Sequence, residues 1–461
     1  MKAETHRFNP TILREYDIRG TIGKDLSEAD ARAIGRAFGT MVARRGGKTV
    51  ATGRDGRTSS PGLETALAEG LAASGLTVLR TGLGPTPMLY YAVNALDADG
   101  GVMVTGSHNP PDMNGFKIMI GKEAFYGAQI QELGKLAASG DYVSGKGRLE
   151  NKPVLDAYID RVVADYRGGR ELKIAWDAGN GSAGEAMVKL TKKLPGKHIL
   201  LYEKIDGTFP NHHPDPTQPE TLEDLQKVVR KEGCDLGIAF DGDGDRVGAV
   251  DGQGRVIFAD LLMVLFAGDV LADKPGSTII ADVKASQVLF DEIARMGGKP
   301  LMWQTGHSLI KTKMKEIKAP LAGEMSGHIF FADRYYGYDD ALYAAMRLAS
   351  IVARATESLG TLRDKLPSVV NTPELRFPCD EARKFTVINE VKQRLKASGA
   401  DVNDIDGVRV RTGDGWWLLR ASNTQAVLVA RCEAKDEAGL ERLKTLLRDQ
   451  VKASGIEPPA F

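Results

Sequence analysis

The sequence predicts an α/β protein in which buried strands alternate with helices. Two helical patterns show the alternation: residues 61–75, with leucines every four positions, and residues 220–233, which end at Gly233. Strands that alternate with helices indicate mainly parallel pairing. Between the helical patterns lie apolar runs that end in turns rich in Asp or Gly: KTVATGRDGR (48–57), GVMVTGSHNP (101–110), LKIAWDAGNGSAG (172–184), LGIAFDGDGDR (236–246) and STIIADVKAS (277–286).

Three segments of altered composition divide the chain into four units. Residues 140–153 are rich in Gly and charge, residues 251–260 close a second unit, and residues 368–380 are typical of a linker. Beyond the linker, a helical pattern over 385–396, short strands with hairpin turns over 407–434 and a final helix predict an α+β unit. We therefore predict three related α/β domains with mixed, mainly parallel sheets and one α+β domain, over residues 1–150, 151–255, 256–367 and 368–461.

Charge and cysteine content exclude some classes of partner. Lys+Arg and Asp+Glu number 61 each, so the basic excess of a general nucleic-acid or anionic-membrane binder is missing. Cys234, Cys379 and Cys432 are too few and too far apart for a disulfide framework or a zinc knuckle, which predicts reduced thiols. The N-terminus has no apolar core of signal-peptide length, and the longest apolar stretch, 261–272, is too short to span a bilayer. We expect a cytoplasmic protein with no nucleic-acid or membrane partner.

Three carboxylates at alternating positions, Asp241, Asp243 and Asp245, follow the apolar run LGIAF. The glycines between them let the chain fold so that the oxygens converge, and a hard cation such as Mg²⁺ would neutralise their repulsion. An EF-hand loop would need Gly and Glu where Arg246 and Gly252 stand. The alternative is a solvated Asp-Gly turn.

Ser107 stands on another predicted turn at a strand end, where a serine can be a nucleophile if a neighbour activates it. No GxSxG elbow surrounds it, although spacing alone leaves a Ser-His-Asp triad open. His108 is expected to be a poor base, because adjacent strand residues point to opposite faces, so a nearby metal would activate the serine better. Lys117 could face a phosphate or move a proton. The alternatives are a structural turn and a solvated lysine.

Two further loops carry polar side chains suited to a sugar phosphate. Glu324, Ser326 and His328 lie within five residues, and carboxylates and hydroxyls can bind vicinal sugar hydroxyls. The segment RASNT (420–424) combines an arginine with hydroxyl and amide donors, which suits an oxyanion. The alternatives are a turn with one core histidine and a polar hairpin loop. Residues 47–49 and 82–84 complete neither nucleotide-binding fingerprint.

In this order, the four loops resemble those of the α-D-phosphohexomutases. The resemblance covers nearly the whole chain and implies four domains around one central cleft, with a phosphoserine and a requirement for Mg²⁺. Gly106 departs from the usual T-A-S-H-N-P, and Met325 matches the phosphomannomutase/phosphoglucomutase branch. The matching segments are EYDIRG (15–20), SHNP (107–110), FPNHHPDPTQPE (209–220), DGDGDR (241–246), TGHSLIK (305–311), GEMSGH (323–328), YGYDD (336–340) and RASNT (420–424).

The resemblance also implies a role for each matching residue. Ser107 is the phosphate carrier and, with the three aspartates, binds the metal. Lys117, Arg246 and His328 are predicted to be catalytic. From the charges of phosphoryl transfer we hypothesise that His328 or His307 is the base and Lys117 the acid, and the sequence does not rank the two histidines. The residues implied to bind substrate are Tyr16, Arg19, His108, Asn109, Lys284, His307, Glu324, Ser326, Arg420, Ser422, Asn423, Thr424 and Arg431.

The implied activity is a phosphomannomutase/phosphoglucomutase. It converts hexose 1-phosphates and hexose 6-phosphates through a phosphoserine and a hexose 1,6-bisphosphate, which also serves as activator. The alternatives are a phosphoglucosamine mutase, a serine- and metal-dependent phosphomonoesterase, and a sugar-phosphate sensor without catalysis. We expect a monomer, although the sequence leaves an oligomer open.

Overall fold

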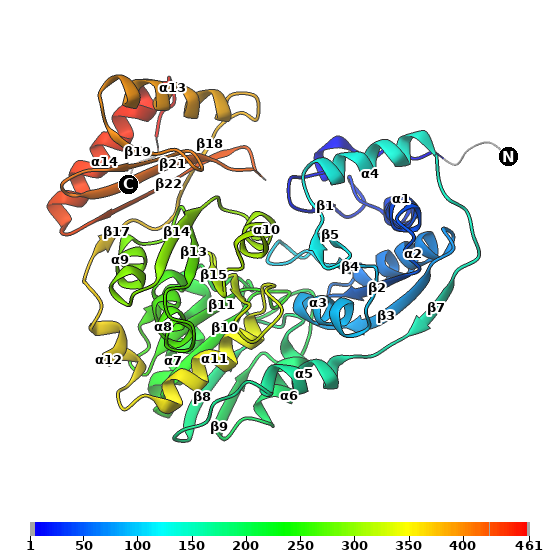
Figure 1. Cartoon of the computed structure of the whole chain (residues 1–461), viewed down its shortest axis with the longest axis horizontal. Coiled ribbons are helices and arrows are strands. Elements are labelled where there is room, and N and C mark those ends of the chain that lie inside the picture. Colours follow the sequence, from blue (N-terminus) through cyan, green and yellow to red (C-terminus); the bar gives the residue numbers. More distant parts are fainter. Residues whose placement is uncertain (1–4, 424, 459–461) are drawn as a thin grey trace.

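In the computed structural model, which describes residues 5–423 and 425–458, the chain forms four sheets one after another. In Figure 1 the unit of the first sheet lies at the right and that of the last at the upper left, with the third unit below the last and the second at the bottom. Within the described part of the chain, each helix is too short or too polar to cross a lipid bilayer. The predicted α/β class is confirmed.

The first sheet has the strand order β1-β5-β4-β2-β3-β7, with β6 on β5. Its helix α1 begins at a capping box, in which Ser27 and Asp30 satisfy each other's backbone N–H groups. The elements of this unit are η1 (Pro10–Ile12), β1 (Ile18–Thr21), α1 (Glu28–Arg44), β2 (Thr49–Arg54), α2 (Ser60–Ala72), β3 (Thr77–Leu83), α3 (Thr86–Ala95), β4 (Gly100–Val104), β5 (Met113–Ile120), β6 (Glu123–Ala124), α4 (Ala128–Ser139) and β7 (Arg148–Asn151).

The second sheet has the order β12-β11-β10-β8-β9, and the third β14-β13-β15-β16. In the second unit the elements are α5 (Leu155–Val163), β8 (Leu172–Asp177), α6 (Gly184–Thr191), β9 (Gly196–Leu201), η2 (Pro219–Leu222), α7 (Glu223–Glu232), β10 (Leu236–Phe240), β11 (Val247–Asp251) and β12 (Val256–Ile257). In the third they are α8 (Ala259–Asp273), β13 (Thr278–Asp282), α9 (Gln287–Arg295), β14 (Lys299–Trp303), α10 (His307–Ile317), β15 (Leu321–Gly323), β16 (Ile329–Phe331), α11 (Ala341–Arg354) and α12 (Leu359–Asp364).

These three sheets share one plan, which places the functional loops. Strands on one side of each sheet pair in parallel, and those on the other side pair antiparallel. The last parallel strand is followed directly by its antiparallel neighbour, as β4 by β5, β10 by β11 and β15 by β16. The serine, metal and sugar loops are the three connections at these points. Corresponding turns of three similar units therefore form most of the site.

The fourth sheet is antiparallel throughout, with the order β17-β22-β21-β20-β19 and β18 on β22. The expectation of a linker over residues 368–380 is wrong for two parts of that segment, because β17 and β18 pair with β22 there. The elements are β17 (Val370–Asn371), β18 (Leu375–Pro378), α13 (Lys384–Ala397), β19 (Asp401–Asn403), β20 (Val408–Arg411), β21 (Gly415–Ala421), β22 (Val427–Ala434) and α14 (Glu437–Lys452).

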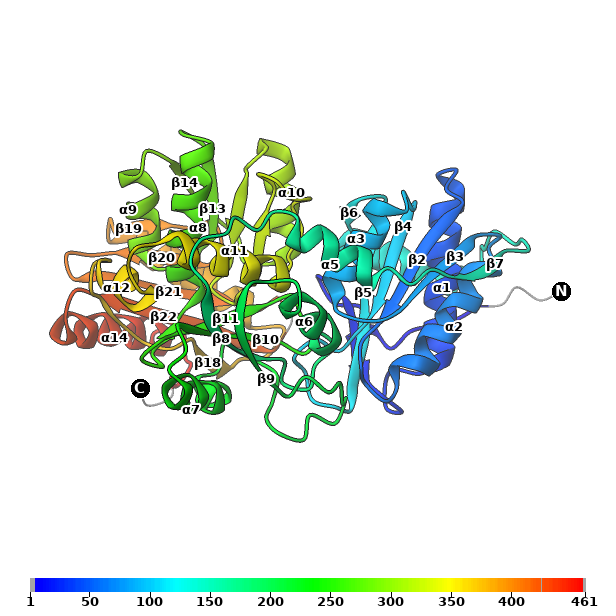
Figure 2. The same ribbon diagram turned by 90° about the horizontal axis from the view of Figure 1, so that it is seen from below.

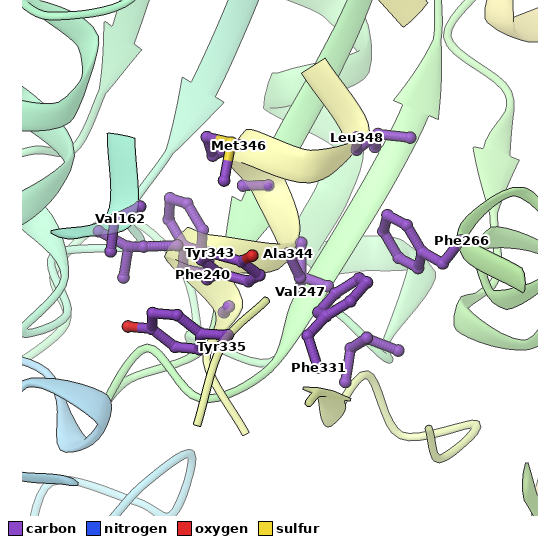
Figure 3. Packing of buried hydrophobic residues seen from close by; sticks show 14 of the residues in the cluster. Val162, Phe240, Val247, Phe266, Phe331, Tyr335, Tyr343, Ala344, Met346 and Leu348 are labelled. Carbon is purple, nitrogen blue, oxygen red and sulfur yellow. The ribbon is translucent and has the colours of Figure 1, made fainter. Parts of the chain in front are cut away.

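A shared apolar core joins the first three units. One cluster of buried side chains includes residues from all three, and Figure 3 shows part of it. Tyr335 and Tyr343 stack with their ring centres 3.9 Å apart, and Phe331 meets Tyr343 edge-on at 5.4 Å. Helix α5 contacts both α3 and α11, as Figure 2 shows from below. The last unit has its own core around α13 and α14, so the first three units form the more continuous body.

Candidate active site

A cleft of about 670 Å³ lies where the four units meet. The predicted aspartates lie beneath its wall and are fully buried, and Thr424 falls outside the described residues. The structure brings together in this cleft the other predicted site residues: Tyr16, Arg19, Ser107, His108, Asn109, Lys117, Arg246, Lys284, His307, Glu324, Ser326, His328, Arg420, Ser422, Asn423 and Arg431.

The metal loop, residues 241–246, joins β10 to β11. One carboxylate oxygen from each of its three aspartates lies within 4.8 Å of the others. Gly244 has a φ of +71°, a conformation that favours glycine, and it lets the chain turn so that alternate side chains converge. Among the described residues, Asp243 Oδ1 and Asp245 Oδ1 have no hydrogen-bond partner. Converging hard oxygens suit Mg²⁺, which Asp241, Asp243 and Asp245 would hold.

Lys117, on β5, reaches this loop from the first unit. Its Nζ donates to Asp243 Oδ2 at 2.7 Å and forms a second ion pair with Asp245. Burial disfavours the ammonium, but the two carboxylates prevail and raise the pKa of Lys117 above its ordinary value. Burial raises the pKa of Asp241 well above its usual range, and the charges of Asp245 and Asp243 add to this. The single positive charge of Lys117 therefore does not neutralise all three aspartates of the metal loop.

The serine loop, residues 105–112, places Ser107 beside the metal loop. Ser107 Oγ donates to Asp241 Oδ2 at 3.2 Å, although the two residues are 134 positions apart. The φ of Ser107 is +51°, in the left-handed region that few residues other than glycine adopt. Its N–H donates to Thr105 Oγ1 at 2.8 Å. The predicted meeting of a serine hydroxyl and the acidic loop is therefore present across two units.

His108 differs from the expectation for a strand. Its Nδ1 lies 3.2 Å from Ser107 Oγ, because Ser107 adopts a left-handed conformation on a turn, so the two side chains do not alternate as they would on a strand. The expectation that they point to opposite faces is wrong. Burial lowers the pKa of His108 well below its ordinary value, and the charges of Arg246 and Arg19 act in the same direction. His108 is therefore a neutral imidazole beside the serine.

The sugar loop, residues 324–328, joins β15 to β16. Glu324 Oε1 accepts a hydrogen bond from the N–H of Gly306 at 2.6 Å. Ser326 Oγ lies 3.5 Å from Glu324 Oε2, so a hydroxyl and a carboxylate lie side by side at the cleft. Glu324 is buried. This pair can bind adjacent hydroxyls of a sugar.

Two histidines stack beside the metal loop, with the rings of His307 and His328 5.4 Å apart. Arg246 Nε donates to His328 Nε2 at 3.0 Å, and His328 Nδ1 lies 3.0 Å from Asp339 Oδ2. Both ring nitrogens of His328 therefore have close neighbours. Burial lowers the pKa of His307 well below its ordinary value, and the charge of Lys311 adds to this, so His307 is neutral.

The phosphate loop, residues 420–426, comprises the end of β21 and the connection to β22. Arg420 Nε donates to Asp406 Oδ2 at 2.9 Å, and Asn423 Nδ2 donates to the hydroxyl of Tyr16 at 2.6 Å. Tyr16 in turn donates to the carbonyl of Thr305 at 3.0 Å. Tyr16 thus links the first, third and fourth units across the cleft.

Other lysine and arginine side chains of the cleft form ion pairs with carboxylates. Lys284 Nζ donates to Glu374 Oε2 at 2.9 Å, and Arg431 Nη1 donates to Asp260 Oδ2 at 3.1 Å. Arg19 pairs with Asp17. The cleft therefore combines fixed positive groups with a sugar-binding pair and an acidic loop, which suits a phosphorylated sugar.

Comparison with known proteins agrees with this geometry. The chain matches the phosphoglucomutase/phosphomannomutase family over its alpha/beta/alpha domain I at residues 10–141, domain II at 156–254, domain III at 259–370 and the C-terminal domain at 374–450. The chain belongs to this family. The resemblance to the α-D-phosphohexomutases is thereby confirmed.

Individual members of the phosphoglucomutase/phosphomannomutase family match along almost their whole length. A phosphomannomutase/phosphoglucomutase of Pseudomonas aeruginosa is 46% identical over 443 residues, 96% of each chain. A phosphoglucomutase of Neisseria gonorrhoeae is 42% identical over 447 residues, 96% of this chain and 97% of its own. The crystal structure of a phosphoglucomutase/phosphomannomutase family protein of Burkholderia thailandensis superposes with a TM-score of 0.93 at 45% identity, covering 98% of this chain and 99% of that one.

In this member of the family, some residues of the site were not predicted from the sequence. Asp339, Asp406 and Glu374 contact predicted residues, and only the first lies in a segment that the resemblance included. Asp55 and Arg57 lie behind the serine loop. The turn that contains them, in KTVATGRDGR, follows a strand in the same manner as the functional loops, and this pattern could have pointed to them.

Proposed function

We propose that this phosphohexomutase acts as a phosphomannomutase/phosphoglucomutase, in which Ser107 carries the phosphoryl group between the 1- and 6-positions of a hexose. The observation that carries the proposal is the 3.2 Å contact between Ser107 Oγ and Asp241 Oδ2 beside a cleft that also holds the sugar and phosphate loops. A nucleophile beside an acidic metal loop serves phosphoryl transfer. The other two loops supply the means to hold a sugar phosphate.

The proposed cycle has two halves. A hydroxyl oxygen of the hexose phosphate attacks the phosphorus of phosphorylated Ser107, so that a P–O bond to the sugar forms as the P–Oγ bond breaks. The hydroxyl proton passes to a base, and the serine oxygen gains a proton from an acid. The resulting hexose 1,6-bisphosphate turns around in the cleft and returns its other phosphoryl group to Ser107 by the reverse steps. Free bisphosphate would phosphorylate the resting enzyme and thereby activate it.

Charge stabilisation would come from both sides of the serine. Mg²⁺, held by Asp241, Asp243, Asp245 and a phosphoserine oxygen, would supply Lewis acidity to the transferred group. Lys117 is buried and Arg246 is half-buried, and ion pairs or hydrogen bonds fix both side chains, so they add positive charge that needs no rearrangement during transfer. Lys117 is also the proposed acid.

Hydrogen bonding favours His307 over His328 as the base. His328 Nε2 already accepts a hydrogen bond from Arg246, so His328 serves to orient the guanidinium. His307 lines the cleft as a neutral imidazole, and its buried Nδ1 lies 3.9 Å from Asp339 Oδ2, so Nε2 is the nitrogen that we propose takes the proton. A neutral imidazole can accept the proton of a sugar hydroxyl.

The substrate would be held at both ends. Glu324 and Ser326 would bind its hydroxyls, and the phosphate loop would bind the phosphate that is not reacting. Residues from the first, third and fourth units would complete the contacts: Tyr16, Arg19, His108, Asn109, Lys284, Arg420, Ser422, Asn423, Thr424 and Arg431. Because the sugar must present either end to Ser107, some movement of the last unit is expected during the cycle.

Replacement of Ser107 by alanine tests the proposal. We expect turnover of glucose 1-phosphate and mannose 1-phosphate, assayed with Mg²⁺ and glucose 1,6-bisphosphate, to collapse in Ser107→Ala. The control is Ser139→Ala, at the exposed end of α4, with wild-type turnover. Retention of wild-type turnover in Ser107→Ala would refute the role of the serine.

The alternatives have different products. A serine- and metal-dependent phosphomonoesterase would release inorganic phosphate steadily from a hexose phosphate without isomerising it, whereas a mutase conserves the phosphate. A phosphoglucosamine mutase would prefer glucosamine 1-phosphate. Parallel assays of the glucose, mannose and glucosamine 1-phosphates, with free phosphate measured in each, separate the three activities. We expect isomerisation of the first two sugars.

A further inference from the structure

The turn after β2 lies directly behind the serine loop. Arg57 is 1% exposed, and its guanidinium donates to the carbonyl oxygens of Ser107 at 2.8 Å, Asn109 at 2.6 Å and Met113 at 2.9 Å, and also to that of Pro110. One side chain therefore holds three carbonyls of the serine loop and the carbonyl of Met113, the first residue of β5. Only an arginine offers a fork of donors that can reach several acceptors at once.

Asp55 completes this arrangement from the other side. Its Oδ2 accepts a hydrogen bond from the N–H of Gly106 at 3.0 Å and lies 3.2 Å from Arg57 Nε. Its Oδ1 accepts from the N–H of Arg57 at 3.0 Å and from the hydroxyl of Ser60. Asp55 thus holds an N–H group of the loop while it fixes the arginine that holds the carbonyls.

The loop needs this support because its backbone is strained at the reactive residue. A serine with a φ of +51° keeps that conformation only where its surroundings enforce it. The packing is close: a Cβ atom at Gly106 would lie 2.4 Å from Arg57 Cζ, and one at Gly242 would lie 2.3 Å from the carbonyl oxygen of Ser107. The absence of a side chain at Gly106 therefore leaves room for the guanidinium.

The second unit packs over Arg57 and shields its hydrogen bonds from solvent. The ring centre of Phe209 lies 5.2 Å from Arg57 Cζ, and a Cβ atom at Gly207 would lie 2.4 Å from Arg57 Cα. Because the guanidinium is desolvated and its donors meet carbonyls, its hydrogen bonds are stronger than they would be in water. Because the second unit packs over Arg57, this residue is not among those that line the cleft.

We propose that Arg57, together with Asp55, is a positioning residue for phosphoryl transfer, which holds Ser107 in the left-handed conformation that aims its oxygen at the metal loop. The inference rests on the proposed role of Ser107. Among residues 5–423 and 425–458, Arg57 has no hydrogen bond or ion pair to the sugar loop or the phosphate loop, so its replacement should slow the transfer step and leave substrate binding nearly unchanged. A displacement of the serine oxygen by about 1 Å can cost about 100-fold in rate.

The test compares Arg57→Lys and Asp55→Asn with Arg80→Lys. Arg80, on β3, is the control, because it forms a half-buried ion pair with the buried Glu64 in the same unit but lies away from the serine loop. For each protein, kcat and KM are measured with glucose 1-phosphate, and the rate of phosphate uptake from glucose 1,6-bisphosphate is followed by intact mass. Thermal unfolding reports stability, and hydrogen exchange in the full chain reports opening of residues 105–110.

We expect Arg57→Lys to lower kcat about 100-fold and to leave KM within about twofold. Phosphate uptake should slow by the same factor, and residues 105–110 should exchange faster. Asp55→Asn should show a smaller change of the same kind, and Arg80→Lys should lose stability without losing kcat.

A wild-type kcat in both Arg57→Lys and Asp55→Asn would overturn the inference, as would a loss that appears in KM alone. If Arg57→Lys does not fold, Asp55→Asn decides by the same criteria. Failure of the proposed function is distinguishable, because wild-type protein would then neither take up phosphate nor isomerise the substrate.

Discussion

Among the described residues, Lys117 is the only lysine that forms an ion pair with the metal loop. The effect of removing its ammonium on stability can therefore be predicted quantitatively. Its side chain is 5% exposed and its Nζ pairs with both Asp243 and Asp245. Removing one partner of a buried ion pair leaves the other charge uncompensated, which costs about 3–5 kcal/mol. In Lys117→Met, three carboxylates share one small buried volume without that ammonium. We therefore expect a loss of this size when no divalent cation is present.

Thermal unfolding in a chelator measures this loss. At about 2–4 °C for each kcal/mol in a unit of this size, the transition that involves the first two units should fall by about 6 to 20 °C. Mg²⁺ should restore more stability to Lys117→Met than to the wild type, because the cation replaces the missing positive charge. Lys122→Met is the control, since Lys122 pairs with Asp97 at the surface and such pairs contribute about 1 kcal/mol or less.

A loss of less than about 1 kcal/mol in Lys117→Met, the ordinary value of a surface pair, would refute the reasoning. So would an equal response of both variants to Mg²⁺. Either result would mean that the carboxylates are compensated without Lys117, and the ion pairs would then not explain the raised pKa of Lys117.

Three further predictions concern the cleft and its supports. Tyr16→Phe removes the hydroxyl that joins Asn423 to Thr305, and the loss of about 1–2 kcal/mol of hydrogen bonding should raise KM about 5- to 30-fold in steady-state assays; an unchanged KM would contradict the link across the cleft. Burial raises the pKa of Asp340 to about 6, so its charged form is disfavoured in the fold. The protonated Asp340 should therefore stabilise the fold at low pH, and about 3 kcal/mol of this stability should be lost as the pH rises from about 4 to about 6. Because asparagine does not ionise, the free energy of unfolding of Asp340→Asn should rise relative to that of the wild type over this pH range. If the difference in unfolding free energy between the two proteins stays constant with pH, the raised pKa of Asp340 is contradicted. Finally, EDTA should abolish turnover and Mg²⁺ restore it, and Asp243→Asn should need more Mg²⁺ for half-maximal rate; turnover that survives EDTA would exclude the metal loop from catalysis.

Local features made the functional loops predictable. The acidic loop follows β10 and the serine loop follows β4, and in both cases an apolar run ends in a turn with polar side chains. The sugar loop follows the three-residue strand β15 and was predicted from its own polar side chains. The positions of strands and turns depend on nearby residues, and the ends of neighbouring strands meet at one edge of a sheet. The shared cleft followed from these two facts and from the resemblance.

What the sequence did not show depends on distant contacts. Strands β17 and β18 form because β22, far along the chain, pairs with them, and the prolines of residues 368–380 suggest a linker when read alone. The position of His108 beside Ser107 depends on the left-handed conformation of Ser107, which no local sequence pattern predicted. The four carbonyl contacts of Arg57 become visible only when β2 and the serine loop are seen together.

Mass spectrometry of the protein before and after incubation with glucose 1,6-bisphosphate and Mg²⁺ tests the central claim most directly. The account predicts that the chain gains one phosphoryl group, that peptide mapping finds it on Ser107, and that added glucose 1-phosphate removes it as bisphosphate forms. A chain that turns over substrate while Ser107 stays unmodified throughout, or that carries the phosphoryl group on another residue, would contradict it.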